Sequence, residues 1–161
     1  MAAEKVSFEQ FLESVDGEFH AFALELHDYL LNNGCKLAIV EQKSGYLAGY
    51  KFGKPPKAMT NFLFRKGRLL VRIYGENSSE YCDFLNTLPP EMVESIDGSG
   101  ECKRLTQNGC SPKCSGYDFT IGDARFQKCR YNCFEFLVTA ESVPFIRAFV
   151  ESEINARMEM K

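Results

Sequence analysis

The chain has 161 residues, a hydrophobic fraction of 45%, a charged fraction of 25% and a formal net charge of −3 at pH 7. This length predicts a single domain over residues 1–161, which can bury about 68–70% of its unfolded surface without covalent staples. The acidic balance argues against broad binding to nucleic acid or to an anionic membrane. Since no stretch approaches the roughly 18 apolar residues of a membrane span, and no signal peptide is recognised, we expect a cytoplasmic protein.

The N-terminal part carries the signals of two helices. Ser7 and Gln10 form a capping box, and the apolar residues that follow recur at helical spacing. The Asp-Gly pair at 16–17 interrupts this pattern, and the Asn-Gly pair at 33–34 provides a C-terminal stop. The predicted helices cover residues 8–15 and 18–32.

From residue 35 the apolar residues alternate, which is the period of β-strands. The Ser-Gly pair at 44–45 and the Lys-Gly pair at 66–67 predict tight turns. Four consecutive strands joined by short turns form an antiparallel meander, and we expect the N-terminal helices to cover one of its faces. These strands are predicted over residues 35–39, 46–52, 59–65 and 68–74. The predicted fold class is therefore α+β.

The second half of the chain adds short helices, a hairpin and a C-terminal helix. The Pro-Pro pair at 89–90 starts a helix, because proline suits the first helical turn, and the Gly-Asp pair at 122–123 turns a hairpin. The predicted elements are helices over 80–88, 90–96 and 142–158 and strands over 117–121 and 124–128. The predicted sub-regions are a helix-and-sheet part at 7–97, a cysteine-rich metal-binding segment at 101–138 and the C-terminal helix.

Five of the seven cysteines lie within thirty-two residues, namely Cys102, Cys110, Cys114, Cys129 and Cys133. Two C-x3-C pairs can supply four thiolates to one tetrahedral ion. In a reducing compartment clustered thiols are more often metal ligands or redox groups than permanent disulfides. We therefore predict a structural zinc site whose ligands are four of these five cysteines.

The conformation of the second pair decides the ligand set. In a helix Cys129 and Cys133 lie within about 5–6 Å and both can bind. In a strand they lie about 13 Å apart, so only one binds and Cys102 joins the site. The alternatives to zinc are an iron–sulfur cluster, a thiol redox centre and buried, inert thiols. Cys35 and Cys82, in a predicted strand and a predicted helix, are interpreted as core residues.

Alternation along residues 68–74 suggests a ligand site on the sheet. The apolar residues 69, 71 and 73 serve the core, which places Arg72 and Tyr74 on the opposite face. A cation and a phenol above an apolar floor are typical of a small-molecule pocket. The predicted ligand-binding residues are Arg72, Tyr74, Arg65 and Lys51. The alternative is a solvated sheet face on which the arginine lies along its neighbours.

Residues 102–131 hold six Lys or Arg against two Asp, a net charge of +4, with interleaved aromatics. This pattern is similar to a nucleic-acid-binding zinc module, although nearby cations also offset the charge of zinc-bound thiolates.

His20 and His27 lie about 10 Å apart along a helix, too far for one ion, and are expected to be surface or partly buried structural residues. No nucleophile elbow, P-loop or dinucleotide fingerprint is recognised, so no catalytic residue is assigned and an enzyme is not favoured.

The order of helix and curved meander, with SGY at 44–46 and NFLFR at 61–65, resembles the YdhG-like family of small bacterial domains of unknown function. The resemblance covers residues 7–97 and implies an α+β fold. Some members of that family are discussed as iron-handling proteins similar to frataxin. The segments RIYG at 72–75 and KCRYNCF at 128–134 resemble segments of uncharacterised proteins of anaerobic bacteria. No catalytic residue is carried over from either resemblance.

The leading functional hypothesis is a non-enzymatic binding module with structural zinc. It binds a small molecule or a protein partner on the sheet face, and it does not bind a membrane. The alternatives are a regulator that contacts nucleic acid through the basic cysteine segment and a thiol redox or metal-handling protein. Salt dependence separates the first two, because phosphate contacts weaken steeply as salt rises. Thiol reactivity separates the third, since zinc-bound thiolates are protected.

Overall fold

The computed structural model describes residues 7–43, 45–53, 56–65, 67–98, 117–128 and 133–159. The chain divides into two compact units. Unit 1 comprises Met1–Val71 and Leu137–Val143, and unit 2 comprises Arg72–Phe136 and Pro144–Lys161. Each unit is therefore built from two separate stretches of the chain.

The N-terminal helices of unit 1 confirm the prediction from local signals. They are α1 (Phe8–Glu13), the single 3-10 turn η1 (Gly17–Phe19) and α2 (His20–Asn32). The Ser7 backbone N–H donates to Gln10 Oε1 at 2.9 Å, and the Gln10 N–H donates to Ser7 Oγ at 3.2 Å, which completes the capping box. After α2, Gly34 adopts a φ of 90°, the left-handed conformation that ends a helix at low cost for glycine.

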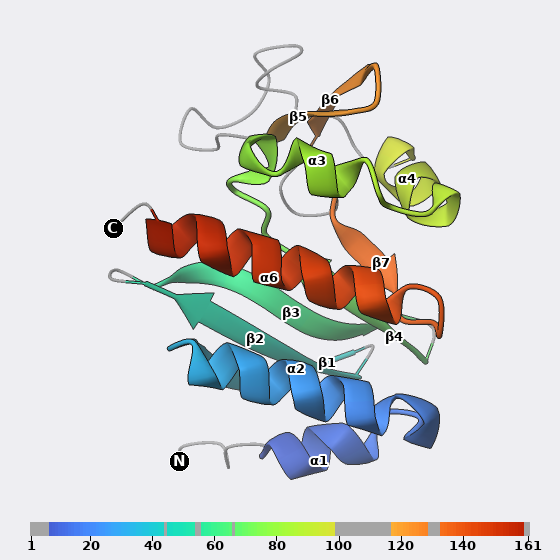
Figure 1. Cartoon of the computed structure of the whole chain (residues 1–161). Helices are drawn as coiled ribbons and strands as arrows, with labels where there is room; N and C mark the ends of the chain where they lie inside the picture. The colour runs from blue at the N-terminus through green and yellow to red at the C-terminus, as the bar shows by residue number, and fades with distance from the viewer. Residues whose placement is uncertain are drawn as a thin grey trace. The chain divides into compact units, whose positions relative to one another are not determined.

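Five strands form one sheet in the order β1-β2-β3-β4-β7. The first four are consecutive in the chain, so the predicted meander is confirmed (Figure 1). Pairing is antiparallel, with Ile39 opposite Ala48 and Ala48 opposite Phe62, and a bulge follows Tyr50. The strands are β1 (Lys36–Gln42), β2 (Gly45–Phe52), β3 (Lys57–Arg65), β4 (Arg68–Ile73) and β7 (Glu135–Leu137).

The fifth strand, β7, was not predicted as part of the sheet. It pairs with β4, because the Ile73 N–H donates to the Phe134 carbonyl at 2.8 Å and the Val138 N–H donates to the Leu69 carbonyl at 3.0 Å. The sequence indicates only an apolar core segment here. A strand of three residues is too short for alternation to reveal, and its partner lies more than sixty residues away in the chain.

Aromatic side chains from the helices and the sheet form the core of unit 1. Phe11 of α1 has its ring centroid 5.7 Å from that of Phe62 and 5.5 Å from that of Phe64, both on β3. Phe22 of α2 meets Phe62 edge to face at 6.4 Å. The N-terminal helices therefore cover one face of the meander within unit 1, as predicted (Figure 1).

Unit 2 contains the hairpin predicted from the Gly-Asp turn, with Gly122 at a φ of 59°. The predicted helix at 80–88 is shorter, because Tyr81 leaves the helical region with φ −128° and ψ 41°. The elements of this unit are η2 (Ser78–Glu80), α3 (Cys82–Leu85), α4 (Pro90–Asp97), β5 (Tyr117–Ile121), β6 (Ala124–Lys128) and most of α6 (Val143–Glu159).

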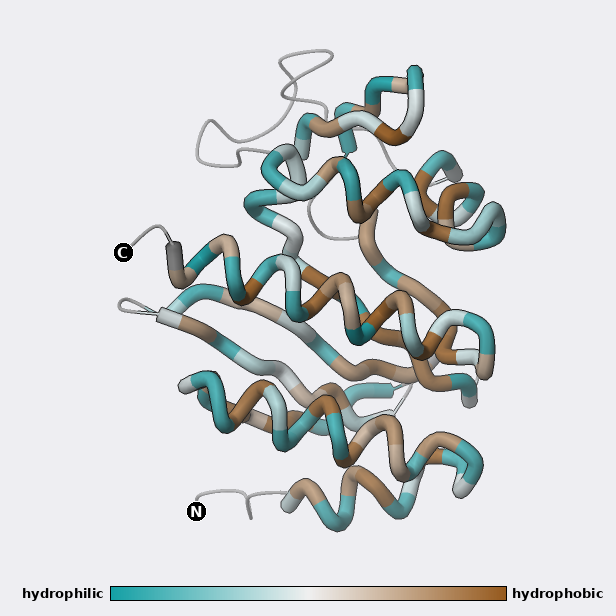
Figure 2. The backbone as a smooth tube through the Cα atoms, viewed as in Figure 1, coloured by the Kyte–Doolittle hydropathy of each residue, from teal (hydrophilic) through white to brown (hydrophobic). Residues whose placement is uncertain are grey.

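The core of unit 2 is centred on Phe149 of α6. Its ring centroid lies 4.8 Å from that of Phe134 and 6.0 Å from that of Phe136. Phe134 in turn contacts Phe119 of β5 at 5.0 Å. Figure 2 shows that α6 mixes hydrophobic and hydrophilic residues along its length, as a helix packed on one side requires. Among the described residues, no helix combines the length and the apolar character needed to cross a bilayer.

Candidate functional site

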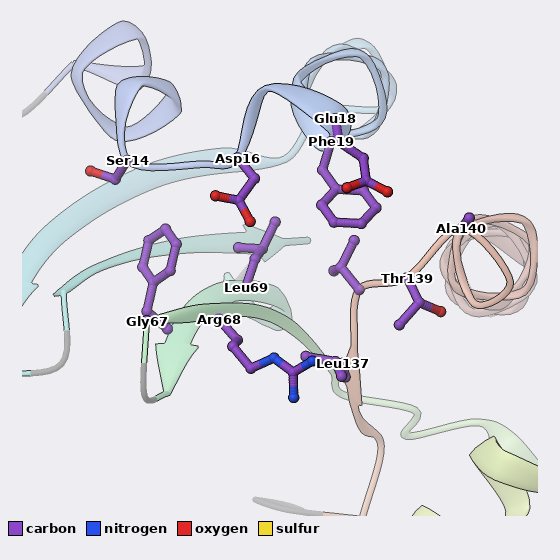
Figure 3. Close-up of a pocket in the computed structure, with 12 residues that line it drawn as sticks. Ser14, Asp16, Glu18, Phe19, Gly67, Arg68, Leu69, Leu137, Thr139 and Ala140 are labelled. Atoms are coloured by element: carbon purple, nitrogen blue, oxygen red, sulfur yellow. The ribbon is translucent and has the colours of Figure 1, made fainter.

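A pocket with a volume of about 290 Å3 lies within unit 1 (Figure 3). Residues from three segments line it: 14–19 between α1 and α2, 64–69 around the β3–β4 turn, and 137–140 after β7. The pocket thus forms where the end of the sheet meets the loop between the first two helices. Its size is at the lower end of the range typical of ligand sites, which begins at about 300 Å3.

The loop between α1 and α2 places two carboxylates at the pocket. Asp16 adopts an extended conformation, with φ −54° and ψ 137°, and begins the turn η1, where its carbonyl accepts from the Phe19 N–H at 2.8 Å. Its side chain makes no capping hydrogen bond. Glu18 lies in the first turn of η1. Both carboxylates are exposed lining residues, so they are available to a molecule that enters the pocket.

Several lining residues are apolar, although most of the exposed lining is polar. Phe64, Leu69 and Val138 are buried lining residues, and Phe19 and Leu137 are half-buried ones. The Leu69–Val138 backbone hydrogen bond holds two of these lining segments together. This part of the lining therefore belongs to the packed sheet and is preformed.

The segment after β7 is held by a reciprocal pair of hydrogen bonds. The Thr139 N–H donates to Ser142 Oγ at 2.9 Å, and the Ser142 N–H donates to Thr139 Oγ1 at 3.0 Å. The Ser142 hydroxyl also donates to the Leu137 carbonyl at 2.8 Å. These bonds stabilise the turn that leads into α6 and fix this wall of the pocket.

The third charge of the pocket is Arg68, the first residue of β4. In the described part of the chain, neither Arg68 nor Asp16 nor Glu18 forms a side-chain hydrogen bond or ion pair with another described residue. In Figure 3 the two carboxylates lie on one side of Leu69 and the guanidinium on the other. Arg68 and Leu69 are consecutive on β4, so their side chains leave the strand on opposite faces, and the guanidinium points away from the carboxylates.

The predicted ligand residues lie elsewhere. Arg72 and Tyr74 belong to unit 2, and Arg72 donates to Glu135 Oε1 from Nε at 3.1 Å and from Nη2 at 2.8 Å. Burial disfavours the charge of Arg72, but the hydrogen bonds to Tyr74 and Glu135 outweigh it and raise the pKa of the guanidinium. A protein carboxylate therefore already compensates this cation, which the sequence cannot show because Glu135 lies on a strand that was not predicted.

The remaining members of that predicted site are not brought together with Arg72 in one unit. Lys51 is exposed on β2 in unit 1 and does not line the pocket. Arg65 ends β3, and its side chain lies outside the described part of the structure. The alternation behind the prediction is confirmed, since Leu69, Val71 and Ile73 are buried and Arg72 is half-buried.

Most of the predicted zinc ligands fall outside the described residues, namely Cys102, Cys110, Cys114 and Cys129. Cys133 is described and fully buried. Within the described ranges no group of three or more His, Cys, Asp or Glu side chains is placed to hold a metal ion. The zinc site and the iron–sulfur alternative therefore stay predictions.

The two isolated cysteines differ. Cys35 is buried, which confirms its interpretation as a core residue. The same interpretation was wrong for Cys82, which is half-exposed at the start of α3. Its Sγ lies 3.5 Å from the Ser79 carbonyl oxygen and 3.5 Å from the Thr120 hydroxyl. Leu85 is the buried residue of this four-residue helix, whereas Cys82 at its first position is only partly covered.

Two cations of the basic cysteine segment are engaged within unit 2. Arg125 of β6 pairs with Asp118 of β5, with Nη2 and Oδ2 2.5 Å apart, and this bond lowers the pKa of Asp118. Lys128 is buried and donates from Nζ to the Asp97 carbonyl at 2.9 Å, at the end of α4. These two charges therefore have internal partners, whereas the sequence presents them as parts of one basic patch.

The histidines are half-buried structural residues, as predicted. His20 Nε2 lies 2.5 Å from the Val15 carbonyl oxygen. His27 Nδ1 lies 2.8 Å from the hydroxyl of Tyr50, and the Phe8 ring stacks on the imidazole with centroids 3.7 Å apart. Burial lowers the pKa of His27, although Asp28 and Glu9 oppose this effect, and burial raises the pKa of Tyr50.

No protein-family model matches the chain. Neither a curated protein nor a solved structure matches it. The resemblance of residues 7–97 to the YdhG-like family therefore stays a prediction.

Unit 2 contains a buried carboxylate network that was not predicted from the sequence. Glu153 of α6 has 0% of its surface exposed and accepts four hydrogen bonds. The donors are the Asn77 N–H at 3.0 Å, Asn77 Nδ2 at 2.9 Å, the Tyr81 hydroxyl at 2.6 Å and Arg157 Nε at 2.7 Å. Burial and the neighbouring Glu153 carboxylate raise the pKa of Tyr81. The network joins the loop after β4 to α6, and its partners satisfy both carboxylate oxygens.

One sequence signal could have revealed this network. Glu153 follows Ile146 and Phe149 at helical spacing, so it lies on the apolar stripe of α6, and Arg157 follows one turn later. An acidic residue on a buried stripe requires a partner, because an unpaired buried charge is strongly destabilising. The identity of Asn77 and Tyr81 as partners is set only by the folded chain.

Proposed function

We propose that this chain is a cytosolic binding module that holds a small molecule in the pocket of unit 1, with a structural zinc ion in its cysteine-rich segment. One observation supports the binding role most directly. Asp16, Glu18 and Arg68 line the pocket and make no ion pair with one another or with another described residue. Ligand pockets characteristically combine an apolar lining with a few convergent polar groups.

The lack of ion-pair partners for these three residues among the described residues fits a binding role better than a purely structural one. Charged groups that stabilise the fold are paired, as Arg72 is with Glu135 and Glu153 is with Arg157. The pocket charges are instead exposed, and they lie beside lining residues that are held in place by the packed sheet. A ligand that contacts the lining residues and pairs with the charges gains binding free energy from both kinds of contact. The protein does not have to rearrange to bind it.

The experiment separates the pocket from the sheet-face site predicted from the sequence. Native mass spectrometry and a thermal-shift screen of small charged metabolites identify a ligand, and its affinity is measured for the wild type, Arg68→Gln and Lys51→Gln. Each variant removes one exposed cation from unit 1, but only Arg68 lines the pocket. We expect weaker binding in Arg68→Gln alone. Loss of binding only in Lys51→Gln, or equal binding in all three proteins, would contradict the pocket proposal.

The zinc proposal rests on the five clustered cysteines and the reducing compartment. We expect about one zinc per chain in protein purified without a histidine tag, measured by elemental analysis, because zinc binding by such sites contributes on the order of 10–16 kcal/mol. Cys110→Ser should therefore destabilise far more than Cys35→Ser, a matched change at a buried core thiol. Folded protein with less than about 0.2 equivalents of any transition metal would refute the proposal, given that the metal is expected to supply folding energy.

A further inference from the structure

We propose that the free edge of the five-stranded sheet, strand β1, pairs with the same strand of a second copy of this chain. β1 stands first in the order β1-β2-β3-β4-β7, and among the described residues it pairs with β2 alone. One side of its seven residues therefore has no backbone partner within the described structure. This inference goes beyond the proposed function, because no residue of β1 lines the pocket of unit 1.

The pairing with β2 identifies the backbone groups that face the open side. Gln42 is paired with Gly45 and only two residues separate them, so they form the hydrogen-bonded pair that closes this hairpin. Hydrogen-bonded and non-hydrogen-bonded pairs alternate along an antiparallel ladder, so Ala38 also bonds to β2. Its carbonyl oxygen lies 3.8 Å from the Cβ position of Gly49, the residue opposite, which agrees with this assignment. The residues whose N–H and C=O groups point to the open side are therefore Leu37, Ile39 and Glu41.

The middle of β1 lacks the features that usually block pairing at a sheet edge. Natural edge strands are protected by proline, by charged side chains or by a bulge. Residues 37–40, Leu-Ala-Ile-Val, contain no proline and no charge, and all seven residues of β1 pair with β2 without a register shift. Leu37 and Ile39 are half-buried and Val40 is 49% exposed. An added strand would therefore remove apolar surface from water and also satisfy the open backbone groups.

A second copy fits this edge best when Ile39 lies on the two-fold axis. A two-fold axis through an antiparallel strand pair sets one residue opposite its own copy. With Ile39 in that place, Leu37 lies opposite Glu41 of the second copy, so all three outward residues of each strand form hydrogen bonds. Registers centred on Ala38 or Val40 leave one outward residue of β1 without a partner in the opposite strand. The Ile39-centred register therefore makes the most backbone bonds.

The charges of β1 favour the same arrangement. In the Ile39-centred register Lys36 lies opposite Gln42 of the second copy and Ala38 lies opposite Val40, so no like charges face each other. The antiparallel orientation also separates the two copies of Lys36, which lie at opposite ends of the strand pair. A parallel pair in the same alignment would set Lys36 beside its copy and Glu41 beside its copy, and like charges in such positions are destabilising. The centre of the interface is apolar and its charges lie at the two ends.

The length of β1 limits the strength of this dimer. Seven residues span about 24 Å at about 3.4 Å per residue, so the interface is one strand long and one strand wide. Such a contact is smaller than the roughly 1,200–2,000 Å2 of a standard stable interface. We therefore expect a dimer that dissociates on dilution. Sedimentation velocity between about 1 μM and about 1 mM protein should show a shift from monomer to dimer, with a reducing agent present to prevent cysteine cross-links.

Two charge variants test the pairing at the two-fold axis. Ile39→Lys and Ile39→Glu each set like charges opposite one another and remove the apolar contact at the axis, so each should dimerise about tenfold more weakly than the wild type. An equimolar mixture of the two variants sets lysine opposite glutamate and should recover the dimer. Leu24→Lys and Leu24→Glu are matched controls, because Leu24 is 45% exposed on α2 and lies outside β1.

A further variant changes the interface at two exposed positions, so it does not depend on whether the sheet tolerates a charge at Ile39. Ala38→Glu/Val40→Glu sets two pairs of like charge across the interface, because Ala38 lies opposite Val40 of the second copy. This variant should also dimerise at least tenfold more weakly than the wild type. Melting curves followed by circular dichroism show which variants are folded and enter the comparison.

The outcomes separate the interface, its register and the proposed function. A wild-type chain that stays monomeric up to about 1 mM overturns the inference, and so does wild-type dimerisation in Ala38→Glu/Val40→Glu or in the folded Ile39 variants. A mixture of the two Ile39 variants that associates no better than either alone overturns the Ile39-centred register. The pocket proposal is judged separately, by the affinity of the screened ligand for Arg68→Gln.

Discussion

Replacing Glu153 by glutamine removes one charge from the most connected buried carboxylate of unit 2 while keeping its shape. Glu153 accepts two hydrogen bonds on Oε1, from the Asn77 N–H and the Tyr81 hydroxyl, and two on Oε2, from Asn77 Nδ2 and Arg157 Nε. A glutamine side chain has one acceptor oxygen and one NH2 donor group. With the NH2 group in the position of Oε2, two donors, Asn77 Nδ2 and Arg157 Nε, face another donor. With the NH2 group in the position of Oε1, the Asn77 N–H faces a donor, whereas the Tyr81 hydroxyl can accept instead of donating.

The expected loss follows from these contacts. Hydrogen bonds to a charged group contribute about 1.5–3 kcal/mol each, so losing one or two costs about 1.5–6 kcal/mol. Removing one partner of a buried ion pair costs about 3–5 kcal/mol by itself, and Arg157 keeps only 9% of its side chain exposed. Both figures describe the same groups, so we expect the free energy of unfolding to fall by about 4 kcal/mol. For a chain of this size that corresponds to a drop in Tm of about 10 °C.

Urea denaturation followed by circular dichroism measures this change. Glu151→Gln is the matched control, because Glu151 lies on the same helix and pairs with Arg147 at 3.4 Å, but their side chains are 41% and 52% exposed. An exposed pair of this kind contributes about 0.3–0.5 kcal/mol. The double variant Glu153→Gln/Arg157→Gln should recover part of the loss, since it also removes the buried cation that the Glu153 carboxylate neutralises. A change below about 1 kcal/mol in Glu153→Gln, or one equal to that of Glu151→Gln, would refute the reasoning.

Two further predictions use other parts of the structure. Because burial lowers the pKa of His27 below its usual value of 6.5, the unfolded chain binds more protons than the folded protein at mildly acidic pH, and the free energy of unfolding should decrease as the pH falls through about 6.5. His27→Gln should flatten this dependence between pH 7 and pH 5 in urea titrations, and an unchanged slope would exclude His27 as its source. Gly75→Ala should destabilise by about 1–3 kcal/mol, because its Cβ would lie 2.7 Å from the ring of Phe134, whereas Gly17→Ala has no atom within 4 Å of its Cβ. Equal melting temperatures for the two glycine variants would show that Phe134 moves aside freely.

The sequence by itself determined the elements that depend on neighbouring residues. The capping box of α1, the glycine that ends α2 and the hairpin of β5 and β6 all use bonds or conformations that span a few residues. The antiparallel meander could also be predicted, because short turns can join consecutive strands only when the strands pair in antiparallel orientation. The alternation of buried and half-buried residues along β4 was readable for the same reason, since its period is a property of the extended chain.

The tertiary structure decided every feature that joins distant parts of the chain. β7 became the fifth strand through its pairing with β4, and this placed Glu135 beside Arg72 and turned a predicted ligand residue into half of an ion pair. The pocket of unit 1 likewise takes its walls from residues near 16, 68 and 138. The spacing of neighbouring residues does not predict contacts between distant residues, because these contacts depend on which buried surfaces pack together in the folded chain. Local chemistry therefore selected the helices and strands, and packing decided which charged side chains of the described residues were paired.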